Sequence, residues 1–172
     1  MSSAADHDRP AGSFLDSYDA ALPHVYGYLS LRCGPRSLVE DLTSETFLAA
    51  VDVLKRNDPP RVTMPWIIGV ARHKLVDHWR RQEREERRQR AMADDKPVVD
   101  PFDVEIDALR VRDVLDQLGA HHRCALTLRY LDDLPVPEVA FFLGRSIHAT
   151  EALLVRARKA FRRVYLREGH DG

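Results

Sequence analysis

The sequence lacks the features that mark secreted, membrane-spanning and disulfide-bonded proteins. Among its 172 residues are only two cysteines, Cys33 and Cys124, and their wide separation fits neither a disulfide framework nor a cysteine zinc site. No apolar run approaches the length needed to span a bilayer. The N-terminal segment has neither the basic start nor the apolar core of a secretory signal. We therefore expect a cytoplasmic protein without membrane insertion.

Catalytic motifs are missing as well. The sequence contains no glycine-flanked serine elbow and no glycine-rich phosphate loop. Its eight histidines include the neighbours His121 and His122 and the pair His73 and His78, but none combines metal-ligand spacing on a helix with a third ligand nearby. We expect no enzymatic activity, no cofactor and no metal site.

The net charge is low, which at first argues against a nucleic-acid partner. The chain has 26 Lys and Arg against 27 Asp and Glu, a net charge of -1. By segment, however, the net charge is -4 over residues 1–60, +5 over 61–92, -6 over 93–138 and +4 over 139–172. Local patches, and not the total, decide whether a surface attracts phosphate. Binding of a polyanion at the two basic segments therefore stays open.

Apolar residues recur with a period near 3.6, which predicts an all-helical (all-α) protein. We expect a helix or helix pair over 14–31, interrupted at Pro23. A second helix is expected from Ser37 to about Arg56, because Ser37 and Glu40 have the spacing of a capping box.

A long helix is expected from about residue 63, with Thr63 as its N-cap. Apolar residues four apart predict its buried stripe: Ile67, Ala71, Leu75 and Trp79. The opposite face carries His73, Asp77, Arg80 and Arg84. From Glu83 onward no apolar stripe continues, so we expect the helix to fray there.

The pattern predicts two small helical domains joined by an acidic flexible linker. We expect a disordered tail over 1–12, a first domain over 13–92, the linker over 93–103 and a second domain over 104–168. The linker combines two prolines with several acidic residues.

The end of the second domain has the pattern of a helix-turn-helix. A short helix over about 135–143 is followed by Gly144, and Ser146 can cap a long helix that runs toward Arg167. The long helix has a buried stripe of Thr150, Leu154, Ala157 and Phe161 and several cations elsewhere. A basic helix of this kind favours DNA binding over a purely structural role.

Three stretches of the sequence resemble bacterial sigma-70-type initiation factors, specifically the compact extracytoplasmic-function (ECF) group. The first is VEDLTSETFLAAVDVL (39–54), which is similar to the helix that docks on the RNA polymerase clamp. The second is PWIIGVARHKLVDHWRR (65–81), which is similar to the helix and loop that engage the minus-10 element. The third is LRYLDDLPVPEVAFFLGRSIHATEALLVRARKAFRR (128–163), which is similar to the minus-35 helix-turn-helix. The resemblance covers about residues 14–166.

The resemblance implies a sigma domain 2 and a sigma domain 4, with RNA polymerase core, promoter DNA and an anti-sigma factor as partners. It assigns polymerase binding to Asp41, Ser44, Glu45, Phe47 and Leu48. It assigns minus-10 DNA binding to Arg61, Trp66, Arg72, His73, Lys74, Asp77, Arg80 and Arg81. It assigns minus-35 DNA binding to Ser146, His148, Glu151, Ala152, Val155, Arg156, Arg158, Lys159 and Arg162.

The chain departs from the family's pattern at four positions. The family usually has Gln at Ser44, Asn at His73, Lys at Glu151 and Arg at Leu153. The two cations absent from the recognition helix imply an altered minus-35 preference. Two other functions stay open at this point: a stand-alone helix-turn-helix regulator, and a sigma-like helical adaptor that binds only proteins.

Overall fold

The computed structural model describes residues 10–89 and 108–168, and every regular element in these two ranges is a helix. The all-helical expectation is therefore confirmed. None of the helices in these ranges combines the length and the apolarity that crossing a bilayer requires. The predicted linker and most of the predicted N-terminal tail lie outside the described residues.

The described helices group into two compact units. The first holds α1 (Pro10–Ser30), α2 (Arg36–Leu54) and the beginning of α3, through Lys74. The second holds the turn 32–34, the remainder of α3 and all later helices. The division falls inside a continuous helix, and the domain bounds that we expect from the sequence stay a prediction.

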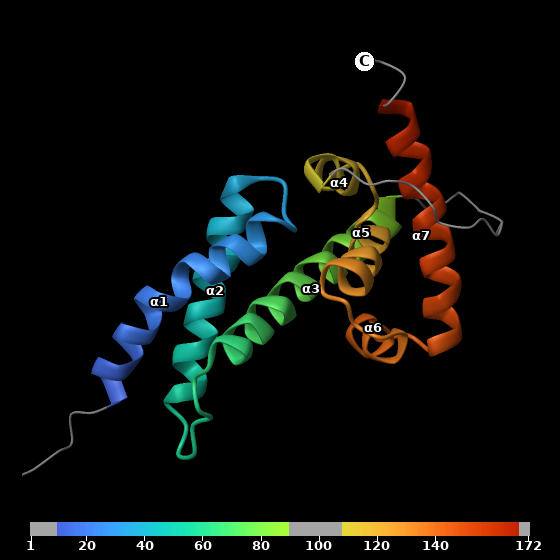
Figure 1. Cartoon of the computed structure of the whole chain (residues 1–172). Coiled ribbons are helices and arrows are strands. Elements are labelled where there is room, and N and C mark those ends of the chain that lie inside the picture. The colour runs from blue at the N-terminus through green and yellow to red at the C-terminus, as the bar shows by residue number, and fades with distance from the viewer. Residues whose placement is uncertain (1–9, 90–107, 169–172) are drawn as a thin grey trace, which may run out of the picture. The chain divides into compact units, whose positions relative to one another are not determined.

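In the first unit, α1 and α2 pack against each other (Figure 1). Helix α1 is continuous through Pro23, so the expected interruption is wrong. Helix α2 begins at Arg36, with Pro35 as its N-cap residue and no side-chain cap. The expected capping box is also wrong, because Ser37 lies inside the helix. Glu40 instead accepts a hydrogen bond of 2.8 Å from the Arg36 guanidinium.

Helix α3 (Met64–Gln89) begins as the sequence predicts. The Thr63 hydroxyl accepts a hydrogen bond of 3.3 Å from the Trp66 amide and caps the helix. The helix continues from Glu83 to Gln89, and the expected fraying of this end stays a prediction. An ion pair of 2.9 Å between Glu83 and Arg87 links successive turns there. The four residues of the predicted stripe are all buried: Ile67, Ala71, Leu75 and Trp79.

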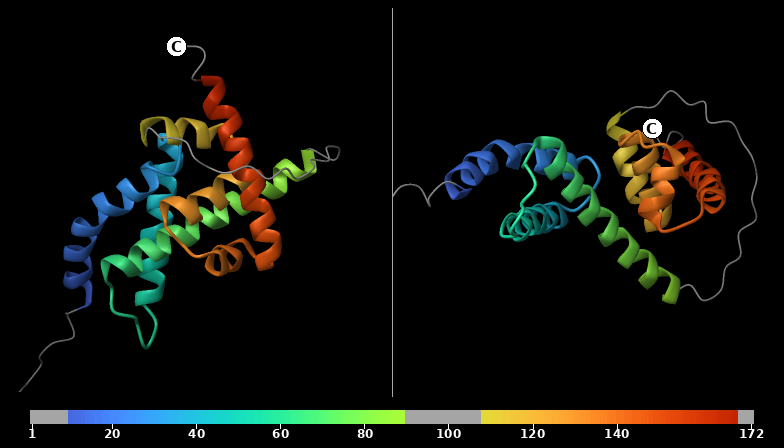
Figure 2. Two further views of the ribbon diagram at one scale, coloured as in Figure 1. Left: turned by 45° about the vertical axis from the view of Figure 1, so that its right-hand side comes forward. Right: turned by 90° about the horizontal axis from the view of Figure 1, so that it is seen from below.

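The second unit is built from four further helical elements, which two views in Figure 2 show. These are α4 (Ala108–Asp116), α5 (Ala120–Leu126) with its π-helical continuation η1 (Thr127–Leu131), α6 (Val136–Leu143) and α7 (Ile147–Glu168). Residues of α4, α5, α7 and the α4–α5 turn form one core cluster: Val114, Leu115, Leu118, Leu126, Ala157, Phe161, Val164 and Tyr165.

Ion pairs bring the turn 32–34 and the end of α3 into this unit. Arg32 and Asp132 form a pair of 2.6 Å, and both side chains are almost fully buried. Arg145 and Glu83 form a second pair of 2.6 Å, which is partly exposed. Breaking a buried pair leaves an uncompensated charge, so the first pair fixes its two segments more strongly than the second.

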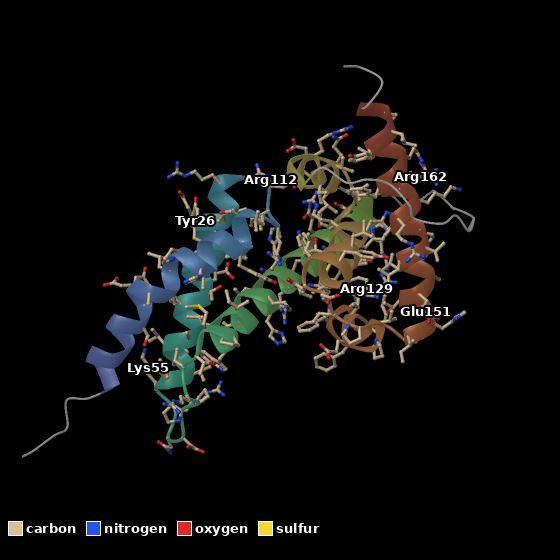
Figure 3. All side chains as sticks on the ribbon, in the orientation of Figure 1. Tyr26, Lys55, Arg112, Arg129, Glu151 and Arg162 are labelled. Atoms are coloured by element: carbon tan, nitrogen blue, oxygen red, sulfur yellow. The ribbon has the colours of Figure 1, made fainter. Side chains whose placement is uncertain are left out.

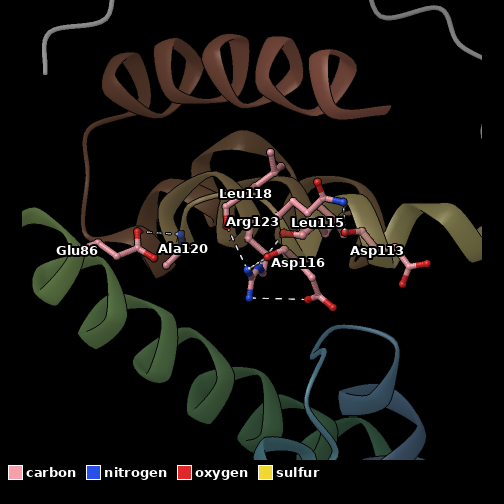
Figure 4. A network of polar contacts seen from close by, with 8 residues as sticks. Glu86, Asp113, Leu115, Asp116, Leu118, Ala120 and Arg123 are labelled. Atoms are coloured by element: carbon pink, nitrogen blue, oxygen red, sulfur yellow. Dashed lines mark hydrogen bonds and ion pairs between the residues drawn. The ribbon is translucent and has the colours of Figure 1, made fainter. Parts of the chain in front are cut away.

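The turn between α4 and α5 is held by one buried cation, Arg123, which is 8% exposed (Figure 4). Its guanidinium donates to the carbonyl of Leu115 at 2.8 Å, of Asp116 at 2.7 Å and of Leu118 at 3.1 Å. The last carbonyls of a helix have no partner within the helix. Arg123 therefore acts as a side-chain cap at the C-terminal end of α4.

We predict that Arg123→Met lowers the free energy of unfolding by about 3 kcal/mol, because it leaves buried carbonyls without donors. The measurement is urea unfolding of the full chain, monitored by circular dichroism. Arg112→Met, at an exposed position of α4, is the matched control and should change stability by less than about 0.5 kcal/mol. Equal stability of the two variants would contradict the capping role.

Candidate binding surfaces

A groove of about 600 Å³ lies between α1 and α2 in the first unit. Its lining is mainly apolar. Residues of both helices contribute to it, among them Tyr18, Leu22 and Tyr26 of α1 and Ser44, Phe47 and Leu48 of α2. Three of the lining residues, all on α2, are expected from the sequence, whereas the three from α1 were missed by sequence reasoning. The apolar stripe of α1 was a signal that could have found the latter.

Phe47 and Leu48 occupy different parts of this groove. Phe47 is only 6% exposed, and its ring meets the ring of Tyr18 edge-on, with centroids 4.5 Å apart. Leu48 is 66% exposed and stands at the rim. A partner would bury Leu48 on binding, whereas Phe47 already belongs to the core and shapes the groove from below.

The polar residues expected on α2 lie beside the groove. Asp41 and Ser44 are exposed and Glu45 is half-buried. On the inner side of α2 the hydroxyls of Thr43 and Thr46 each donate to the carbonyl four residues earlier, at 2.7 Å. The buried hydroxyls of α2 are thus hydrogen-bonded within the helix, and the acidic face of the helix is left to solvent.

The expected minus-10 residues lie on α3 and in the segment before it. His73, Asp77 and Arg81 are exposed and four residues apart, so they share one face of the helix. The cations Arg72, Lys74 and Arg80 are half-buried beside this face. Two more residues complete the expected set: Arg61 is exposed before the helix, and Trp66 is half-buried in its first turn.

The helix-turn-helix is formed by α6 and α7, with a tight turn between them (Figure 1). Gly144 ends α6 with φ 62°, a left-handed conformation that glycine adopts without a steric penalty. The Ser146 hydroxyl accepts a hydrogen bond of 3.1 Å from the Ala149 amide, so the predicted N-cap of α7 is confirmed. The predicted buried stripe of α7 is confirmed as well: Thr150, Leu154, Ala157 and Phe161.

The first turns of α7 expose His148, Glu151 and Ala152 to solvent. Figure 3 shows Glu151 and Arg162 on the side of α7 that faces away from α5. Leu153 is 1% exposed and belongs to the core, so it does not reach a ligand of this surface. The expected residues that follow are half-buried: Val155, Arg156, Arg158, Lys159 and Arg162.

One contact on this surface was missed from the sequence. Arg158 donates a hydrogen bond of 3.1 Å to the hydroxyl of Tyr130, which lies on η1 and is exposed. Tyr130 therefore holds the guanidinium of Arg158 beside the recognition helix. No sequence signal pairs these residues, because 28 positions separate them.

Neither cysteine offers a reactive group. Cys33 and Cys124 are both buried free thiols. Burial raises the pKa of the Cys33 thiol to about 12, with the nearby Asp116 carboxylate as the next cause. Burial also raises the pKa of Cys124. Within residues 10–89 and 108–168, no group of three His, Cys, Asp or Glu side chains is arranged to hold a metal ion.

Two family models match the chain: Sigma-70 region 2 over residues 18–85, and Sigma-70, region 4 over residues 108–161. The ECF RNA polymerase sigma factor BldN of Streptomyces coelicolor is 31% identical over 160 residues, which make up 90% of this chain and 61% of BldN. This chain thus spans less than two thirds of BldN. The ECF RNA polymerase sigma factor SigF of Caulobacter vibrioides is 36% identical over 131 residues, covering 71% of this chain and 68% of SigF.

A solved structure shows the same fold. It is the sigma factor RpoE in complex with the anti-sigma factor NepR from Bartonella quintana. RpoE has a TM-score of 0.53 and is 18% identical, and the match covers 89% of this chain and 96% of the RpoE chain.

We predict that Ser146→Ala lowers the free energy of unfolding by about 1 kcal/mol, because the first turn of α7 loses its side-chain cap. Ser146→Asp restores an acceptor and should recover most of the loss. Thermal unfolding of the three proteins at one pH is the measurement. A Ser146→Asp protein no more stable than Ser146→Ala would rule out the cap as the cause.

Proposed function

Because the chain belongs to the sigma-70 family, with both region 2 and region 4 present, we propose that it is an ECF-type sigma subunit of RNA polymerase. It binds the polymerase core and directs it to promoters through the minus-35 and minus-10 elements. The observation that carries this proposal is the presence of both family regions in one chain, each coinciding with a surface of suitable chemistry. We also propose that the subunit is not itself an enzyme and acts in the cytoplasm.

We assign polymerase binding to the outer face of α2 and the groove beside it. Leu48 is a large apolar side chain exposed at the rim of an apolar groove, with Asp41 and Ser44 exposed next to it. An interface needs an apolar centre and a polar rim, and this surface offers both. Phe47 contributes by shaping the groove from the core side.

We assign minus-10 binding and melting to α3 and the segment before it. Unpaired bases must be held out of the duplex, which takes stacking surfaces for the bases and cations for the backbone. Arg72, Lys74 and Arg81 supply the cations, while His73 and Asp77 are exposed and available to contact base edges. Trp66 is half-buried in the first turn, and its accessible part offers an aromatic surface for stacking.

We assign minus-35 binding to α7. A recognition helix enters the major groove with its N-terminal residues toward the base edges. Here those residues are His148, Glu151 and Ala152, all exposed. The Glu151 carboxylate can accept from the amino group of cytosine, and the Ala152 methyl suits the methyl of thymine. This combination favours a minus-35 element that differs from one read by a Lys-bearing helix.

We further propose regulation by an anti-sigma factor that covers the polymerase- and DNA-binding surfaces. The relative RpoE, with the same fold, is described in complex with such a partner. The exposed rim of the α1–α2 groove gives a helix of that partner the same apolar contact that polymerase would use.

The test of the proposed function is transcription in vitro with purified core polymerase and a library of genomic promoter fragments. The full chain should direct initiation from a subset of fragments, and core alone should not. Binding to core without initiation would favour the helical adaptor. Tight operator binding without core would favour the stand-alone regulator.

We predict that Leu48→Asp weakens core binding at least tenfold, because it places a charge in an apolar contact. Leu31→Asp is the matched control, since Leu31 is equally exposed (67%) and does not line the groove. Fluorescence anisotropy of labelled chain titrated with core measures both. A similar loss in the two variants would contradict the assignment of the groove.

A further inference from the structure

A second concave site lies in the second unit, between one flank of α7 and the α4–α5 turn. It has a volume of about 260 Å³. One wall is formed by Gln117, Leu118 and Gly119 of the turn together with His122 of α5. The opposite wall is a flank of α7 that carries four cations: Arg156, Lys159, Arg163 and Arg167. None of His122, Arg163 and Arg167 is among the binding residues that the sequence predicts.

The chemistry of the lining points to an anion. The four cations are spaced three, four and four residues apart, so they stand on successive turns of one helix flank. Among the described residues that line the site there is no Asp or Glu, although acidic residues outnumber basic ones in the chain. A solvated charged stripe on a helix usually alternates the two signs, and this one does not.

Among the residues that the structure describes, no carboxylate pairs with these cations. No ion pair to Arg156, Lys159, Arg163 or Arg167 is formed among the described residues. Arg156 and Lys159 are half-buried, so part of their hydration is lost. Like charges held together and partly removed from water are unfavourable unless an anion joins them.

We propose that this cleft is a phosphate-binding site. The cleft has a volume suited to one or two phosphate groups. Guanidinium and ammonium groups line one side of it, and the imidazole of His122 and the amide of Gln117 line the other. The phosphate belongs either to the promoter backbone or to a free polyphosphate. Only the first source rests on the proposed function.

The position of the cleft fits the promoter backbone. Arg156 lies ten residues beyond Ser146, about 15 Å along the helix axis. The major groove is about 12 Å wide, so a helix that reads bases with its first turn can bring a residue this far along its axis to the backbone that borders the groove. The exposed part of that first turn carries Glu151 and no Lys or Arg. Affinity for the duplex must therefore come from cations farther along the helix, and the cleft gathers four of them.

The test uses the full chain with Arg163→Gln and Arg167→Gln combined. Both positions are exposed, so the fold is retained. The matched control is Lys55→Gln with Arg112→Gln, which removes the same charge from exposed positions outside the cleft. Two readouts are compared for the wild type, the cleft variant and the control.

The first readout is thermal unfolding with sodium pyrophosphate, against sodium chloride of equal ionic strength. A free-phosphate site raises the wild-type midpoint by about 5 °C at a hundred times the dissociation constant. The cleft variant loses this rise and the control keeps it. This readout needs neither polymerase nor promoter, so it is independent of the proposed function.

The second readout is holoenzyme binding to promoter duplexes with an intact or scrambled minus-35 element over a range of salt. If the backbone is the source, the cleft variant lowers the salt slope by about 1.8, equally on both duplexes, since each lost phosphate contact removes about 0.9.

Either response, absent from the control, supports the site. No difference between variant and wild type in both readouts overturns it. Weaker core binding as the sole effect also overturns it, because a protein would then occupy the cleft. A wild-type chain that directs no initiation, with an intact pyrophosphate response, would refute the function and leave the site.

Discussion

The second unit depends on the guanidinium of Arg123. Helix α4 has 9 residues and α5 has 7, and helices of this length are marginal in water by themselves. Arg123 joins them because it donates to three carbonyls around the α4–α5 turn while remaining buried. The turn is thereby held beside α7. One wall of the cleft therefore depends on this cation, while α7 packs against the turn through the apolar core.

The binding surfaces follow from how amphipathic helices divide their faces. Each of α2, α3 and α7 buries one apolar stripe and leaves the opposite face to solvent. On α2 that outer face is acidic beside an apolar groove, and on α3 and α7 it carries cations. The net charge of -1 thus hides surfaces of opposite sign on different helices. Those surfaces suit one subunit that must meet both a protein and DNA.

Much of this arrangement is readable from the sequence. The stripes of α3 and α7 and the caps Thr63 and Ser146 were predictable, because periodicity and capping act over a few neighbouring residues. The same local rules failed at α2, where the N-cap lies two residues earlier than expected. Ser37 has the right spacing for a cap, yet Pro35 takes the N-cap position.

The helical class, the helix-turn-helix and the order of the basic and acidic segments all follow from the sequence, because each depends on short-range pattern. Which apolar side chain is core and which is offered to a partner depends on how the helices pack. Phe47 and Leu48 are adjacent in sequence, yet Phe47 is buried and Leu48 is exposed, since only Phe47 packs against an aromatic ring of α1. The same holds for His122 and Arg163, which face one cleft although 41 positions separate them in the sequence. Proximity between distant residues arises from packing of whole helices, and no local pattern encodes it.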